Sequence, residues 1–163
     1  MSDNHLLLLR INELMLQQEQ YSLSVDMLFD DSLIGDFVKR IQIDSPYQQM
    51  LLEGVLTESV CDENLFVSFT VEGYFHYVLG EVLLEKYNAF GGEFILNKLK
   101  ESEWIHLPLG LSQMLIHMVQ NGEYQFLIRA LKEQVNDEIL VPSIIQTLII
   151  GKKTDFILSL IHI

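Results

Sequence analysis

The stretch from Val55 to Thr70, VLTESVCDENLFVSFT, decides the fold of this chain. Before this stretch apolar residues recur at helical spacing, whereas within it apolar and polar residues alternate. The polar tip at 61–64 divides the alternating segment into two runs. The apolar members of the second run share one face: Leu65, Val67 and Phe69. This pattern predicts a β-hairpin with strands at 55–60 and 65–70.

Three helices and one short helical turn are predicted before the hairpin. The clearest start is Asp44-Ser45-Pro46, because a cap residue there precedes a proline at the first helical position. The other starts rest on Ser, Asp and Asn residues at N-cap positions. The segments run from Asn4 to Glu19, from the cap Ser24 to Phe29, from Asp31 or Ser32 to about Ile41, and from Pro46 to about Leu56.

A long amphipathic helix is predicted after the hairpin, capped by Thr70 and running over 71–88, before Gly91-Gly92. Its inward stripe is predicted to be Val71, Phe75, Val78 and Val82.

The opposite side of this helix is a candidate docking face. It aligns four residues at intervals of three or four: Gly73, Tyr77, Gly80 and Leu84. A glycine inside a helix costs up to about 1 kcal/mol relative to alanine, so close approach by another helix is expected to compensate. That helix belongs either to the following part of this chain or to a separate domain, and the sequence leaves both open.

The chain then repeats itself at a spacing of about 30 residues. The copies begin at Gly92, Gly122 and Gly151. Neither complete copy has the ankyrin or tetratricopeptide signature, so the subclass stays open, and two unrelated helical hairpins are the alternative. The predicted helices are Glu93–Glu101, Pro108–Gln120, Glu123–Gln134 and Ile139–Ile150.

The last six residues, Leu158–Ile163, read as the translation of a transposase sequencing adapter and are expected to be a non-native tail. An ordinary buried helix end is the alternative. The expected organisation is a helical, winged-helix-like unit at 1–88, truncated helical-pair repeats at 89–157, and the tail at 158–163.

The formal net charge of −13 is unevenly placed. Residues 1–85 hold fifteen Asp and Glu against Arg10, Lys39 and Arg40, and no Lys or Arg lies between Ile41 and Glu85. Because affinity for nucleic acid depends on neutralising phosphates, this half is expected to repel DNA and RNA. No apolar run is long enough to span a bilayer, so we expect no membrane partner and a cytoplasmic location.

No catalytic, cofactor or metal residues are predicted, and the chain is not expected to be an enzyme. It lacks a Gly-x-x-x-x-Gly-Lys-Ser/Thr loop, and its single cysteine, Cys61, excludes cysteine-cluster sites and internal disulfides. The histidines do not have the spacing of a metal motif.

The acidic pairs Asp30-Asp31 and Asp62-Glu63 lie at predicted turns or caps, where acids are favoured structurally. The candidate serines Ser24, Ser45 and Ser112 have no partners that spacing reveals.

Helices followed by a two-stranded hairpin are the order of a winged-helix fold. The strings LLEGVLT at 51–57 and LFVSFTVEGYF at 65–75 resemble the end of the winged-helix segment in signal-transducing STAND-type ATPases, including the NACHT class. Phe69, Tyr74 and Phe75 match the aromatic positions of that family. The family's Arg or His after the wing is replaced here by Thr70-Val71.

The resemblance implies a mainly α protein with a winged-helix-like unit, one β-hairpin and antiparallel helical-pair repeats. It implies a non-catalytic regulatory and protein-interaction segment whose partner is another protein or a nucleotide-binding domain of the same polypeptide. A stand-alone helical-repeat adaptor is the alternative. A transcription factor is disfavoured by the missing positive charge.

Overall fold

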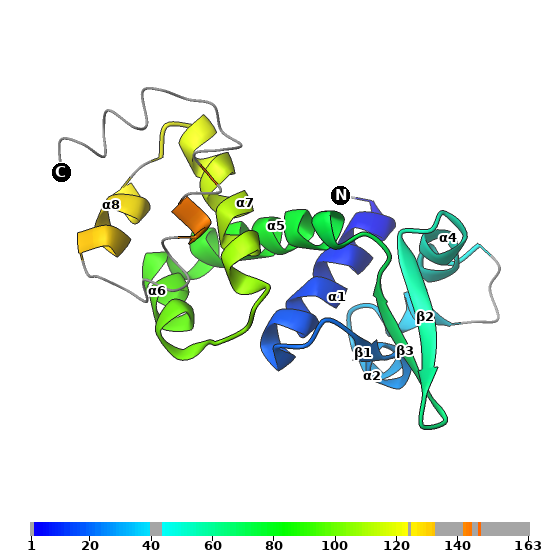
Figure 1. Ribbon diagram of the computed structural model, residues 1–163. Helices are drawn as coiled ribbons and strands as arrows, with labels where there is room; N and C mark the ends of the chain where they lie inside the picture. Colours follow the sequence, from blue (N-terminus) through cyan, green and yellow to red (C-terminus); the bar gives the residue numbers. More distant parts are fainter. Residues whose placement is uncertain (1, 40–43, 124, 133–141, 145–146, 148–163) are drawn as a thin grey trace. The chain divides into compact units, whose positions relative to one another are not determined.

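The computed structural model describes residues 2–39, 44–123, 125–132, 142–144 and 147, and these form a mainly α protein with one small antiparallel sheet (Figure 1). The chain divides into two compact units, Met1–Val78 and Leu79–Ile163. The division falls inside helix α5 (Glu72–Phe90) instead of after residue 88. No helix in the described part of the chain is long and apolar enough to cross a membrane.

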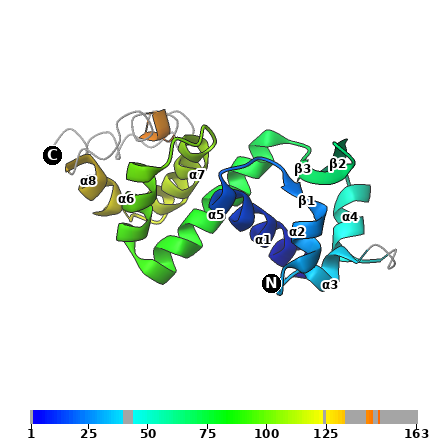
Figure 2. The same ribbon diagram turned by 90° about the horizontal axis from the view of Figure 1, so that it is seen from below.

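The first unit combines short helices with a three-stranded antiparallel sheet. Its sheet has the order β1-β3-β2, and the last two strands form the predicted hairpin. Figures 1 and 2 show α1, α2 and α4 gathered beside this sheet. The elements before α5 are α1 (Asp3–Gln18), β1 (Leu23–Ser24), α2 (Val25–Asp30), α3 (Gly35–Val38), α4 (Pro46–Leu52), β2 (Leu56–Cys61) and β3 (Asn64–Phe69).

The observed sheet has one strand more than the predicted hairpin. The sequence predicts two strands, but β1 adds a third, because Leu23 pairs with Val67 and Ser24 with Phe66. The hairpin turn is also tighter than predicted. Cys61 pairs with Asn64, so only Asp62 and Glu63 form the turn, with φ of 48° and 66°. Positive φ at both central residues is the geometry of a type I′ turn, one of the two common two-residue hairpin connections.

The caps before α2 and α4 agree with prediction, and three other boundaries do not. Ser24 and Ser45 accept hydrogen bonds from the first turns of α2 and α4. The helix predicted from Asp31 to about Ile41 is wrong, because α3 is the only helix in the described part of that segment. Helix α4 starts where predicted but ends at Leu52 and not at about Leu56. The third concerns α5, whose first turn is closed by the Val71 carbonyl, so Val71 is an exposed cap residue and not part of the inward stripe.

The core of the first unit is built from apolar residues of every element, and it includes an aromatic cluster around Phe75. Phe75 is fully buried, and its ring meets Tyr21 edge-on at 4.9 Å and Phe69 at 5.5 Å. The largest fully buried side chains are Leu7, Ile11, Met15, Leu23, Leu28, Ile34, Tyr47, Leu56 and Phe75.

The second unit contains the end of α5 with α6 (Gly92–Glu101), α7 (Leu107–Gln120) and α8 (Gln125–Lys132). These helices occupy the predicted positions, while most of the predicted helix Ile139–Ile150 and all of the expected tail Leu158–Ile163 lie outside the described residues. Gly91 and Gly122 precede α6 and α8 with φ of 77° and 79°. Gly91 directly precedes α6 and Gly122 lies three residues before α8, so the two glycines do not hold equivalent positions in the predicted repeats.

Contacts between the repeats join positions about 35 residues apart. Arg129 of α8 pairs with Glu93 of α6, 36 residues earlier. Ser143 donates to the Pro108 carbonyl at 2.7 Å. The Thr147 hydroxyl donates to the Ser143 carbonyl at 2.7 Å and also lies 3.4 Å from the Ser112 carbonyl. Segments about 35 residues apart thus contact one another within this unit, an offset longer than the predicted repeat spacing of about 30 residues.

Candidate protein-interaction surfaces

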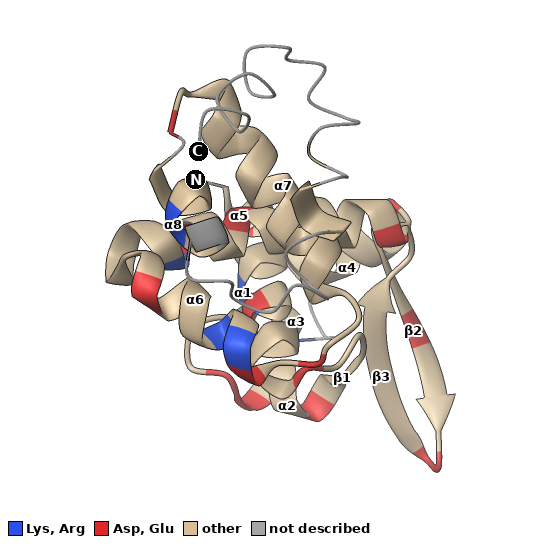
Figure 3. Ribbon diagram, turned by 60° about the vertical axis from the view of Figure 1, so that its left-hand side comes forward, with Lys and Arg blue, Asp and Glu red and all other residues tan. Residues whose placement is uncertain are grey.

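The elements that contact DNA in a nucleic-acid-binding winged helix are acidic and apolar in this unit. The candidate recognition helix α4 has no Lys or Arg, and Glu53 follows it directly. Leu52 at its end is 78% exposed, and Val60 on β2 is 74% exposed. Figure 3 shows acidic residues at the tip of the β2–β3 hairpin and no basic residue along its strands.

The candidate docking face on α5 is split by the structure. Gly73 and Tyr77 belong to the first unit and are exposed, and a Cβ at Gly73 would meet no atom within 4 Å. Gly80 and Leu84 belong to the second unit. Gly80 is buried, and a Cβ there would lie 2.5 Å from the Gln113 Cβ of α7. The close helix approach expected from the glycines therefore occurs at Gly80 and involves a helix of the same chain.

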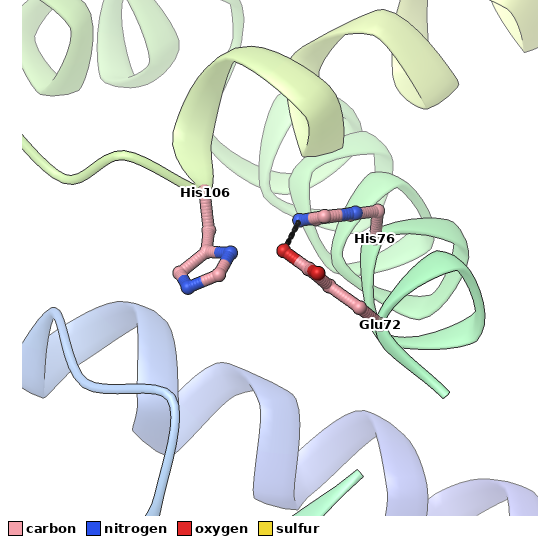
Figure 4. Close-up of side chains that lie close together, drawn as sticks. All are labelled: Glu72, His76 and His106. Atoms are coloured by element: carbon pink, nitrogen blue, oxygen red, sulfur yellow. Dashed lines mark ion pairs between the residues drawn. The ribbon is translucent and has the colours of Figure 1, made fainter. Parts of the chain in front are cut away.

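Glu72 and His76 lie on one face of α5, with the His76 Nε2 3.8 Å from a Glu72 carboxylate oxygen (Figure 4), a contact that is an ion pair when the histidine is protonated. The two residues are one helical turn apart, the spacing at which helix side chains meet. His76 is buried, whereas Glu72 is largely exposed. Burial and the nearby charge of Glu72 together raise the pKa of the Tyr21 phenol, which donates to the Phe69 carbonyl at 2.8 Å. His106, in the second unit, packs its ring against Trp104 at 5.4 Å.

The acidic pair Asp30-Asp31 contains a structural carboxylate that sequence reasoning assigned only to a cap. Asp31 accepts hydrogen bonds from the backbone N–H groups of Leu33 and Ile34. The Arg10 guanidinium donates two more, at 3.1 and 2.9 Å. Burial alone would raise the pKa of Asp31, but these hydrogen bonds outweigh it, so the pKa lies below its ordinary value of 3.8.

We expect the Asp31 cluster to make the first unit acid-sensitive. Because the folded-state pKa of Asp31 is depressed, its contribution to stability is present above 3.8 and is lost as the pH falls through the lower folded value. Denaturant unfolding at a series of acidic pH values measures this loss. Asp31→Asn should unfold more easily at neutral pH and show a smaller loss on acidification. An equal acid dependence in both proteins would contradict the assignment.

The remaining residues singled out from sequence have structural roles. Asp62 and Glu63 form the hairpin turn, and Ser112 donates to the Leu109 carbonyl at 2.7 Å. Cys61 is a free, exposed thiol. Sequence reasoning missed the pairing of Arg10 with Asp31, for which the only signal is a lone Arg within an otherwise apolar run of α1.

The comparisons with known proteins add no relative. No family, no curated protein and no solved structure matches the chain.

Proposed function

We propose that this chain is a non-catalytic regulatory and protein-interaction segment of a STAND-like signalling ATPase, acting in the cytoplasm. The winged-helix-like unit would transmit a signal, and the helical pairs would bind or sense a protein ligand. Helix α5 joins the two, since it starts directly after the wing and ends before the first repeat helix.

The observation that carries the proposal is the chemistry of the surface formed by α4 and the hairpin. A winged helix that binds DNA uses cations to hold the phosphate backbone before it reads bases. Here the same elements expose Leu52 and Val60 among acidic residues. Exposed apolar side chains surrounded by charge of one sign favour a protein partner over a nucleic acid.

The decisive experiment for the ATPase part is to read the uninterrupted gene upstream of the codon for Met1. A Gly-x-x-x-x-Gly-Lys-Ser/Thr loop in the same reading frame is expected. The extended protein should then bind ATP, and mutation of the loop lysine should abolish binding. An upstream region without such a loop would reject the ATPase and favour the second candidate, a stand-alone helical-repeat adaptor, which the contacts between helices of the second unit support.

We also expect no nucleic-acid binding at physiological salt. The first unit has thirteen Asp and Glu against three Lys and Arg, and Arg10 and Lys39 are paired with Asp31 and Asp36. A mobility-shift assay with duplex DNA and with RNA tests this. Micromolar binding that weakens with added salt would show that phosphates are being neutralised and would overturn the protein-interaction reading.

A further inference from the structure

The corner where α2 turns into α3 exposes three apolar side chains that are not part of the core. Phe29 is 53% exposed, Leu33 is 60% exposed, and Met27 is also exposed. Single exposed apolar residues are normal on protein surfaces, but large apolar side chains gathered together mark an interaction site. These three lie within seven residues of one another in a short, tightly folded segment.

Hydrogen bonds from α1 and within the backbone fix the conformation of the corner. The Arg10 side chain of α1 anchors Asp31, which in turn caps the N–H groups of Leu33 and Ile34. The Gly35 N–H donates to the Asp31 carbonyl at 2.8 Å. A Cβ at Gly35 would lie 2.4 Å from the Phe29 carbonyl oxygen. The end of α2 and the start of α3 therefore approach each other through their backbones. A surface fixed in this way loses little conformational entropy on binding.

The charge around the corner determines the chemistry of its partner. Asp26 and Asp30 are exposed and flank the apolar cluster, and Figure 3 shows acidic residues on α2. Among the described residues, the two cations of this unit already pair with other carboxylates, Arg10 with Asp31 and Lys39 with Asp36. A purely apolar partner would strip water from the two carboxylates without compensation, and a phosphate-rich partner would be repelled.

We propose that the α2–α3 corner, formed by Met27, Phe29 and Leu33 with Asp26 and Asp30, binds a basic amphipathic segment of a partner protein. Apolar side chains of that segment cover Phe29 and Leu33, while its Lys or Arg side chains pair with Asp26 and Asp30. This assignment rests on the proposed protein-interaction function and names the chemistry of the partner.

The test uses the full chain and a fluorescein-labelled synthetic peptide that has Leu on one face of a helix and Lys on the other. Fluorescence anisotropy should show saturable binding that weakens as salt is added, because the charges of the two partners are opposite. Phe29→Ser with Leu33→Ser should weaken binding by about tenfold or more, as expected for two apolar anchors. Asp26→Asn with Asp30→Asn should weaken binding and reduce its salt dependence.

The matched control is Val71→Ser with Ile105→Ser, which removes two exposed apolar residues that lie outside both the corner and the surface formed by α4 and the hairpin. This variant should bind the peptide as the original chain does. All the substituted side chains are exposed, so circular dichroism should show an unchanged fold. Absence of binding, equal loss in the control variant, or equal binding of a peptide with Glu in place of Lys would each overturn the proposal. None of these results bears on the upstream-gene test, so the two failures can be told apart.

Discussion

Phe75→Ala is expected to destabilise the first unit by about 3–5 kcal/mol, the range for removing a fully buried aromatic ring. Phe75 has 0% exposure, and its ring joins Tyr21 of the segment after α1 to Phe69 of β3. Its carbonyl also accepts a hydrogen bond at 3.0 Å from the buried Asn12 side chain of α1. Truncation would therefore leave a cavity where a helix, a strand and α5 meet.

Denaturant unfolding followed by far-ultraviolet circular dichroism measures this loss. Tyr74→Ala is the control, because Tyr74 is the preceding residue on the same helix but is exposed. It should cost about 1 kcal/mol or less, as surface substitutions do. Similar losses in both variants would mean that the aromatic cluster around Phe75 is not the centre of this core.

The parts of the fold that could be predicted from sequence are those with local causes. The cap before α4 was correctly placed because Ser45-Pro46 sets its own backbone geometry, and the hairpin was found because alternation is a property of neighbouring residues. Strand β1 could not be found in this way. It has two residues, and its partner Val67 lies 44 positions after Leu23, so only tertiary structure makes it a strand.

The interaction surfaces were harder to predict, because exposure is decided by packing. Val71 fits a helical stripe by spacing, but α5 starts one residue later, and the side chain points outside the core. Phe29 and Leu33 are exposed at the corner that replaces the helix predicted from Asp31, and Arg10, a residue distant in sequence, hydrogen-bonds to Asp31 at that corner.

The sequence singles out two glycines on α5, but it cannot say which of them another helix covers. The structure separates them, because Gly73 faces open space and Gly80 lies against α7. We therefore expect Gly80→Ala and Gly73→Ala to have opposite effects. A Cβ at Gly80 would lie 2.5 Å from the Gln113 Cβ and 3.0 Å from the Met114 backbone nitrogen, so α7 would have to shift.

Overpacking of this kind typically costs about 1–3 kcal/mol, and backbone contact places Gly80→Ala toward the upper end. Gly73→Ala should instead be neutral or stabilise by up to about 1 kcal/mol, since alanine is the better helix former. Trp104 is the only tryptophan of the chain and is buried in the second unit, so its fluorescence reports unfolding of that unit. The Trp104 transition should move to lower denaturant in Gly80→Ala and stay in place in Gly73→Ala. A stable Gly80→Ala protein would mean that α5 and α7 do not approach closely, and the compensation for this glycine would then have to come from outside the chain.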